Sequence, residues 1–170
     1  MTDFDMGATK TRDPHLIEDA AAIWAQATAY RDDVDANDVS VEDAVPLIRD
    51  VLAASERSFL LAIADPETGA VVCFGAVQPD REQSSGPDRG ELRYLGVAPE
   101  HWGEGWARRL LVALPDAARQ ENFRDIILWV YADNTRAIWV YEAMGWNATG
   151  RTRKHPVTRR IEAEYRLKLG

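Results

Sequence analysis

The hydrophobic positions in the first third of the chain recur at the spacing of amphipathic helices. After Pro14 this spacing predicts a helix over about 14–30, and Ser40 is placed to cap a second helix that starts at Val41. The acidic segment 31–40 between them has the composition of a turn. The apolar positions of the two helices are Leu16, Ala20, Ile23, Trp24 and Ala27, followed by Val41, Val45, Ile48 and Leu52.

The apolar pattern then becomes strand-like. Two short runs, Ser58–Ala64 and Ala70–Gln78, are separated by the turn residues DPETG and therefore predict a β-hairpin. Residues 79–90 are polar and rich in turn-forming residues, so we expect a loop there. Glu91–Ala98 returns to a strand-like run, which stops before Pro99.

The second half of the chain alternates between helical and strand-like patterns. Helical spacing resumes at Gly105, and Pro115 is expected to kink that helix or to end it early. The run Asp125–Tyr131 predicts a buried strand, and Asn134–Met144 predicts a helix. Two closing strands are expected at Trp146–Thr152 and Ile161–Leu169. The order α-α-β-β-β-α-β-α-β-β predicts an α+β (α/β mixed) fold around one mixed sheet, as a single domain over residues 1–170.

Composition narrows the class of protein. Apolar residues make up 46% and charged residues 28%, the balance of a soluble globular protein. No apolar run approaches the ~20 residues of a membrane span, and the N-terminus lacks a secretory pattern. The single cysteine, Cys73, excludes an internal disulfide, so we expect a small core residue and a cytoplasmic protein. The scattered His15, His101 and His155 do not have the spacing of metal ligands, so no metal is predicted.

The net charge of −8 lies entirely in the first 50 residues, which hold 12 acidic and 4 basic side chains. This distribution argues against nucleic acid as a partner, because phosphate contacts require cationic surface. Two interpretations of the acidic segment stay open. It is either a solvated face that aids solubility or a patch, including Asp32, Asp33 and Asp35, that attracts a cationic substrate.

The segment Glu91–Leu111 predicts a strand, a short glycine-containing loop and a helix in succession. Gly103 and Gly105 allow the backbone to approach a ligand closely, and Ala107 leaves the start of the helix uncrowded. The first N–H groups of such a helix form an anion site. Neither a Walker GK[ST] motif nor a complete G-x-G-x-x-G follows, so nucleotide hydrolysis and dinucleotide binding are not indicated.

A second segment, NTRAIWVYEAMGW at 134–146, places polar groups on one face of a helix. Asn134, Ala137, Ile138 and Tyr141 share this face. Taken singly, Asn134 is better explained as a helix N-cap and Tyr141 as a half-buried core residue.

Together the two segments resemble the GNAT superfamily of N-acetyltransferases. The resemblance rests on the run L95-G-V97-x-P99-x-x-W102-x-x-G105-x-A107 and on N134-x-x-A137-x-x-x-Y141-x-x-x-G145-W146, in the order and separation typical of the family. It covers about residues 14–169. It implies a central mixed β-sheet in which two parallel strands splay apart, flanked by helices.

The resemblance also implies acetyl-CoA as cosubstrate and assigns roles to particular positions. Backbone groups of Leu95, Gly96 and Val97 are expected to pair with the pantetheine arm, and Asn134 is expected to bond to the same region. Tyr141 is expected to protonate the departing thiolate, since tyrosine, with a pKa near ~10, is protonated at neutral pH. The amides expected to hold the diphosphate are those of Trp102, Gly103, Glu104, Gly105, Trp106, Ala107 and Arg108.

The chain departs from the family pattern at Trp102, where Gln or Arg is usual, and at Pro115 in the following helix. The first departure removes a side-chain contact but leaves the backbone amides.

Glu91 is the candidate base that takes the proton of the attacking amine. Strand alternation predicts that Glu91, Arg93, Leu95 and Val97 share one side, with Glu91 toward the acceptor cleft. It acts directly or through a water, or it is only a solvated charge at the end of the strand. Trp24 is a candidate wall of the acceptor pocket.

The sequence therefore predicts an N-acetyltransferase that moves acetyl from acetyl-CoA to a primary amine by direct transfer in a ternary complex. The acceptor is a small-molecule or peptide amine that the sequence does not identify, and no membrane or nucleic-acid partner is expected. A homodimer is common in the family and stays open. The alternative is a CoA-binding sensor or docking module without turnover.

Overall fold

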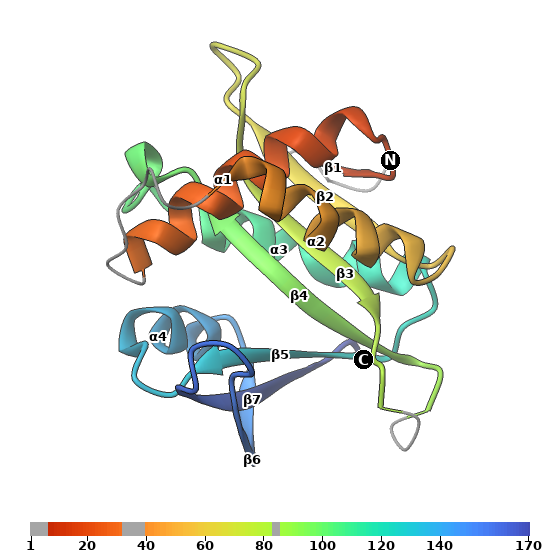
Figure 1. Cartoon of the computed structure of the whole chain (residues 1–170). Coiled ribbons are helices and arrows are strands. Elements are labelled where there is room, and N and C mark those ends of the chain that lie inside the picture. The colour runs from red at the N-terminus through yellow and green to blue at the C-terminus, as the bar shows by residue number, and fades with distance from the viewer. Residues whose placement is uncertain (1–6, 32–39, 83–85) are drawn as a thin grey trace.

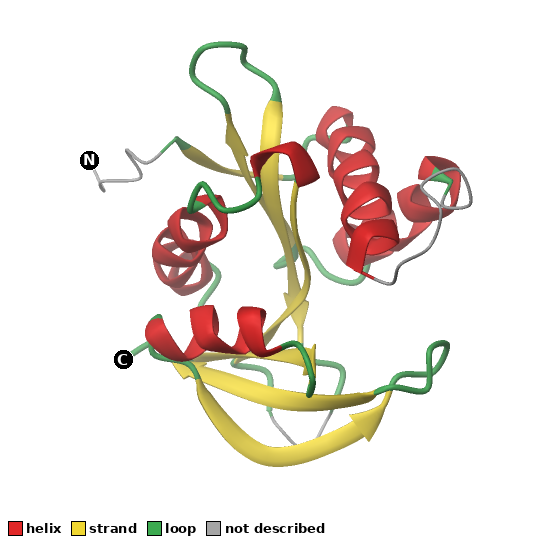
Figure 2. Cartoon of the chain, turned by 90° about the vertical axis from the view of Figure 1, so that its left-hand side faces the viewer, coloured by secondary structure: helices red, strands yellow, loops and turns green. Residues whose placement is uncertain are grey.

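A computed structural model describes residues 7–31, 40–82 and 86–170, and their strands form one seven-stranded sheet in the order β1-β2-β3-β4-β5-β7-β6. Helices α1 and α2 cover one face of this sheet, and α3 and α4 lie on the other (Figures 1 and 2). Asp32, Asp33 and Asp35, the predicted attracting patch, lie outside the described residues. The elements are β1 (Ala8–Thr11), α1 (His15–Arg31), α2 (Val41–Ala53), β2 (Phe59–Ala64), β3 (Val71–Pro79), β4 (Arg89–Val97), the 3₁₀ turn η2 (Pro99–His101), α3 (Trp106–Gln120), β5 (Asp125–Tyr131), α4 (Thr135–Ala143), β6 (Asn147–Lys154) and β7 (Ile161–Lys168).

Helix α2 begins directly after the N-cap that the sequence predicts. Ser40 accepts a hydrogen bond from the backbone N–H of Glu42 and caps α2, as the sequence indicates. Val41, expected on the apolar side of α2, is instead 40% exposed. Pro115 does not end α3, which continues to Gln120. Proline removes one helical hydrogen bond, and the buried side chains of α3 on either side of it hold the helix against the sheet.

Strand β1 is a strand that the hydrophobic pattern does not predict. It is four residues long and pairs antiparallel with β2 at the edge of the sheet, from Ala8↔Ile63 to Thr11↔Leu60. Only Ala8 is buried in it. An edge strand of four residues with one buried side chain shows no alternation of apolar and polar positions, so the sequence pattern does not reveal it.

The parallel pair predicted by the resemblance is β4 and β5. Their pairing runs only from Arg89↔Asp125 to Glu91↔Ile127 and then stops, although β4 continues for six more residues to Val97. The two strands therefore part at the carboxyl end of β4, as the family resemblance predicts (Figure 1).

Strand β4 contains a β-bulge that changes which way its side chains face. Ala76 pairs with Tyr94 but the next residue, Val77, pairs with Leu92, so Arg93 is an extra residue in β4. Leu92 and Leu95 consequently both pack in the core on the α3 side. Glu91 precedes the bulge and therefore faces the α1–α2 side. The prediction that Glu91 shares a side with Leu95 and Val97 is wrong, because the bulge interrupts the alternation.

The apolar core lies in two parts, one on each face of the sheet. On the α3 side, Leu110, Leu111 and Leu114 pack on the sheet residues Phe59 and Leu61. On the other side, Ile23 and Ile48 lie against Phe74. Among the described residues, no helix has the length and apolar character needed to cross a membrane.

Candidate functional site

The backbone of β4 is oriented toward the gap beside β5. Ala98 N–H donates to Val72 O in β3, so alternate residues of β4 direct their backbone groups to β3. The intervening residues Leu95 and Val97 direct theirs the other way, toward the side where β5 has separated. This edge is the strand-like edge at which the sequence predicts pantetheine pairing.

The loop between β4 and α3 has the backbone that its glycines predict. Gly103 and Gly105 have φ of 83° and 85°, in the left-handed region that glycine adopts without strain. Gly105 is the N-cap of α3, and its carbonyl accepts the N–H of Arg109. The N–H groups at the start of α3 precede the first complete helical turn and are directed out of the helix. The loop thus has the form of an anion site.

Trp102 contributes more to this site than its backbone amide. Its indole Nε1–H donates to Val97 O at 2.7 Å, at the edge of β4 that faces the gap. The ring also meets Tyr30, at the end of α1, with centroids 5.2 Å apart. The tryptophan that replaces the family's usual Gln or Arg therefore links the anion loop to the pantetheine edge, a contact that the sequence reading did not predict.

Glu104 places a carboxylate in a loop that is predicted to bind phosphate. The carboxylate accepts from Trp106 Nε1 at 2.8 Å and lies 2.9 Å from His101 Nδ1. The hydrogen bond with His101 lowers the pKa of Glu104 and raises the pKa of His101. His101 in its charged form offsets the charge of Glu104.

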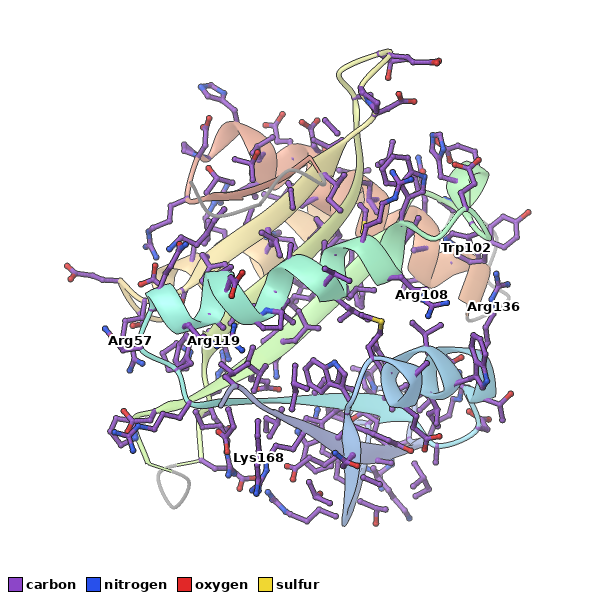
Figure 3. The ribbon with its side chains drawn as sticks, turned by 180° about the vertical axis from the view of Figure 1, so that it is seen from behind. Arg57, Trp102, Arg108, Arg119, Arg136 and Lys168 are labelled. Carbon is purple, nitrogen blue, oxygen red and sulfur yellow. The ribbon has the colours of Figure 1, made fainter. Side chains whose placement is uncertain are left out.

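Arg136 is a basic residue of the site that sequence reasoning missed. It belongs to α4, yet a Cβ on Gly103 would lie 3.8 Å from its Nη2. Trp102, Arg108 and Arg136 gather at the same end of α3, whereas Arg119 lies at the other end (Figure 3). Nothing in the local sequence brings Arg136 to a loop 33 positions earlier, so only the packing of α4 beside α3 could reveal it.

We expect Arg136→Ala to raise the Kd for acetyl-CoA about tenfold, because a hydrogen bond to a charged group contributes about 1.5 kcal/mol or more. Calorimetric titration measures the change. Arg124→Ala is the matched control: the Arg124 side chain is 86% exposed and follows the far end of α3. Equal Kd values for wild type and Arg136→Ala would exclude Arg136 from the phosphate site.

Asn134 caps the start of α4, which is the structural role that the sequence allows for it. Asn134 Oδ1 accepts from Ala137 N–H at 3.2 Å, so the residue is the N-cap of the helix. Its side-chain N–H groups are not used in this bond, and a contact with pantetheine stays a prediction. Tyr141 is half-buried, packs against the α3-side core and lies 6.0 Å from the Trp146 ring.

Glu91 is a buried carboxylate beside the point where β4 and β5 part. It is 5% exposed and lies 3.4 Å from Arg93 Nη1. Burial raises the pKa of Glu91, while the charge of Arg93 acts in the opposite direction. A carboxylate whose pKa is shifted toward neutrality is better matched to take a proton from an amine than an exposed one.

The α1–α2 face beside Glu91 contains a pocket of about 200 Å³. Its lining residues are Leu47, Asp50, Val51, Arg81, Arg93 and Tyr94. Tyr94 stacks edge-on against Trp24, with centroids 4.8 Å apart, so Trp24 supports the wall of this pocket from behind. The arrangement is consistent with the predicted place of Trp24 near an acceptor pocket.

The basic residues near the last two strands are paired with acids. Glu164, 2% exposed, accepts from Arg151, and Glu162, 7% exposed, accepts from Arg153, at 2.9 and 2.7 Å. The Arg153 guanidinium also lies over the Trp129 ring, 4.1 Å from its centroid. Two basic side chains of this face are therefore paired with buried acids. The described residues contain no group of three or more acidic, His or Cys side chains that could hold a metal ion.

Cys73 lies in the core, as the sequence predicts, and its Sγ contacts Trp106 O at 3.8 Å. Burial raises the pKa of its thiol to about 12. A thiol in this state is a poor nucleophile.

We therefore expect native protein to leave an aromatic disulfide reagent unreacted, whereas the guanidinium-unfolded chain releases one equivalent of chromophore, because Cys73 is its single cysteine. Absorbance of the released thiolate measures both states. Rapid reaction of the native protein would show that this strand opens readily.

Comparison with known proteins agrees with the fold. A model of the acetyltransferase (GNAT) family matches residues 20–146. Because this match covers well over half of the 170 residues, the chain belongs to the GNAT family.

The chain is similar in sequence to parts of longer proteins. The mycothiol acetyltransferase of Kocuria rhizophila is 33% identical over 90 residues, which are 53% of this chain and 30% of that protein. The mycothiol acetyltransferase of Renibacterium salmoninarum is 27% identical over 134 residues, 77% of this chain and 39% of that one. N-acetyltransferase family 8 member 2 of Rattus norvegicus is 33% identical over 82 residues, 48% and 36% of the two chains. The chain thus spans 30–39% of the length of these relatives.

Solved structures match nearly the whole chain. A putative phosphinothricin N-acetyltransferase superposes with a TM-score of 0.76 at 16% identity, over 96% of this chain and 99% of that chain. A putative acetyltransferase from Salmonella typhimurium, solved with its cofactor acetyl-CoA, gives 0.72 at 17% identity, over 96% and 94%. At these identities the likeness establishes the fold, and the predicted α+β architecture is confirmed.

Proposed function

We propose that this chain is an N-acetyltransferase that moves the acetyl group of acetyl-CoA to a primary amine, with both substrates bound together. The observation that carries the proposal is the parting of β4 from β5 directly before the glycine loop that opens α3. An extended arm can pair with the free edge of β4 while its phosphates reach the start of the helix.

The residues at this place fit acetyl-CoA. Backbone groups of Leu95 and Val97 supply a strand edge. Gly96 lies between them, and its lack of a Cβ lets Phe74 and Ile23 pack closely on the α1–α2 side. The amides from Trp102 to Arg108 suit a diphosphate, with Arg136 adding positive charge at Gly103. Even so, Trp102 already donates to Val97 O, so this indole must shift if the pantetheine arm uses that carbonyl.

Glu91 and Tyr141 divide the proton transfers. An ammonium acceptor gives one proton to Glu91, directly or through a water, and its nitrogen then bonds to the acetyl carbonyl carbon. As the carbon–sulfur bond breaks, the Tyr141 hydroxyl donates a proton to the thiolate of CoA, and the second proton that the nitrogen loses on becoming an amide restores the tyrosine. The two groups lie on opposite faces of the sheet, because Glu91 faces α1–α2 and α4 packs on the α3 side. The thioester carbon then lies between them, where β4 and β5 part.

The acceptor is a small-molecule or peptide amine, and we place it on the α1–α2 face beside the pocket that Arg93 and Tyr94 line. Asp50 at this pocket suits an ammonium group, and Arg93 suits a carboxylate on the same molecule. The single, buried cysteine suits a reducing compartment such as the cytoplasm.

The experiment combines two measurements on the same protein. Calorimetric titration with acetyl-CoA tests binding, and release of the CoA thiol across a panel of primary amines tests turnover. Tyr141→Phe should bind acetyl-CoA like wild type and release thiol more slowly. Failure of the wild type to bind acetyl-CoA would overturn the proposal. Binding without amine-dependent release would favour the alternative, a CoA-binding sensor or docking module.

A further inference from the structure

Gln78, near the end of β3, is a buried side chain with no evident purpose in the core. It is 0% exposed, and neither its Oε1 nor its Nε2 has a hydrogen-bond partner among the described residues. A buried amide with both atoms unpaired is rare in folded proteins, and such groups usually bind water or serve a function. The Gln78 amide can therefore form hydrogen bonds with a buried water or another small group.

The register of the sheet places Gln78 against Glu91. The two residues are directly opposite each other in the antiparallel pair of β3 and β4. The preceding pair, Val77 and Leu92, packs in the core on the α3 side, so Gln78 and Glu91 both face the α1–α2 side. Residues opposite each other in this way have Cβ atoms about 4.5–5.5 Å apart.

A third polar group converges on the same place. Arg93 Nη1 lies 3.4 Å from Glu91 Oε1, and Arg93 Nε, like the Gln78 amide, is buried without a hydrogen-bond partner among the described residues. Arg93 is the extra residue of the bulge, and it lines the pocket on this face together with the next residue, Tyr94. The amide of Gln78, the Nε–H of Arg93 and the carboxylate of Glu91 thus offer hydrogen-bond donors and acceptors on one face of the same strand pair.

We propose that Gln78 is a positioning residue that holds a water molecule against the carboxylate of Glu91, and that this water relays the proton of the acceptor amine. The inference rests on the proposed acetyl transfer. In the relay, the water gives a proton to Glu91 and takes one from the ammonium group, so that it is regenerated and the amine nitrogen is left with its lone pair. One water suits the site because it can donate to Glu91 and to Gln78 Oε1 while accepting from Gln78 Nε2 or Arg93 Nε.

The charges that face Glu91 come from three elements. Arg93 of β4 and Arg153 of β6 favour its ionised form, whereas Asp80, after β3, disfavours it. Gln78 is uncharged, so replacing it with an apolar residue leaves these three charges in place. A shift of the titration of Glu91 on such a replacement then reports the lost water and not a changed charge.

The test compares Gln78→Leu with wild type. Leucine is close to glutamine in size and removes an unpaired buried amide, so we expect a Tm no lower than that of wild type. With the amine of the panel that gives the fastest thiol release, we expect kcat to fall about tenfold with an unchanged KM for acetyl-CoA. The acidic limb of the kcat/KM profile should move to higher pH, because a water that donates to Glu91 stabilises its ionised form.

Gln120→Leu is the control, since Gln120 is exposed at the end of α3. A ¹³C NMR titration of the Glu91 carboxyl in both proteins tests the water without turnover, and its midpoint should rise in Gln78→Leu. Wild-type kcat and an unmoved Glu91 midpoint in Gln78→Leu would overturn the inference. If wild type releases no thiol with any amine, the proposed transfer fails, and a moved midpoint would still place the water at Gln78 and Glu91.

Discussion

Replacing Glu91 with glutamine is expected to lower kcat/KM about a hundredfold to ten-thousandfold, the range that one general base contributes. The variant keeps the size of the side chain and removes only its ability to take a proton. Because burial raises the pKa of Glu91, the activity of wild type should fall on the acidic side with a midpoint above that of an ordinary glutamate, near ~4.3. The pH profile of thiol release measures both effects.

The stability of Glu91→Gln separates a catalytic role from a structural one. A raised pKa means that the folded state favours the protonated carboxyl, so the contribution of Glu91 to stability is fully present below about pH 4.3 and is lost as pH rises through the folded-state pKa. Glutamine has no such loss, and we expect its Tm at neutral pH to equal or exceed that of wild type. Glu67→Gln, in the exposed β2–β3 turn, is the control. Full activity in Glu91→Gln would remove Glu91 from the chemistry.

Gly105→Glu is expected to raise the Kd for acetyl-CoA by at least about a hundredfold. The new carboxylate would stand at the N-cap of α3, where it repels the diphosphate and competes for the helix N–H groups. The backbone adds a second cost, because φ of 85° disfavours any side chain with a Cβ by about 1–2 kcal/mol. Calorimetric titration gives the Kd.

A matched substitution separates these two costs. Gly86 has φ of 83°, and a Cβ added there meets no atom within 4 Å, as at Gly105. It lies before β4, at the opposite end of the strand from the anion loop. Gly86→Glu should therefore show the backbone strain, as a lower Tm, with the wild-type Kd. Comparable Kd values for Gly105→Glu and wild type would mean that the diphosphate binds elsewhere.

Features that depend on neighbours in sequence were predictable. The cap at Ser40, the turn between β2 and β3, and the start of α3 at Gly105 each follow from a few adjacent residues. Their conformations are set by local hydrogen bonds and by φ preferences, which act within one turn of chain. The order of elements followed from the hydrophobic pattern, and the splayed sheet followed from the two family motifs.

Features that depend on strand register were not predictable in the same way. Alternation placed Glu91 beside Leu95, but the bulge at Arg93 reversed the faces. A bulge arises from the pairing of one strand with its neighbour, so the pattern of apolar and polar residues within β4 does not predict it. The same register brings Gln78 opposite Glu91. The sequence around Gln78 by itself predicts only the end of a strand.

The sequence by itself determined the α+β class, the anion loop and the acidic excess of the first 50 residues, because each depends on composition or on contacts between near neighbours. Only the tertiary structure decided what surrounds the reacting groups. It brought Arg136 to Gly103, joined Trp102 to Val97 and buried Glu91 beside Arg93. Those contacts depend on where helices and strands pack, and packing is settled by the whole core together.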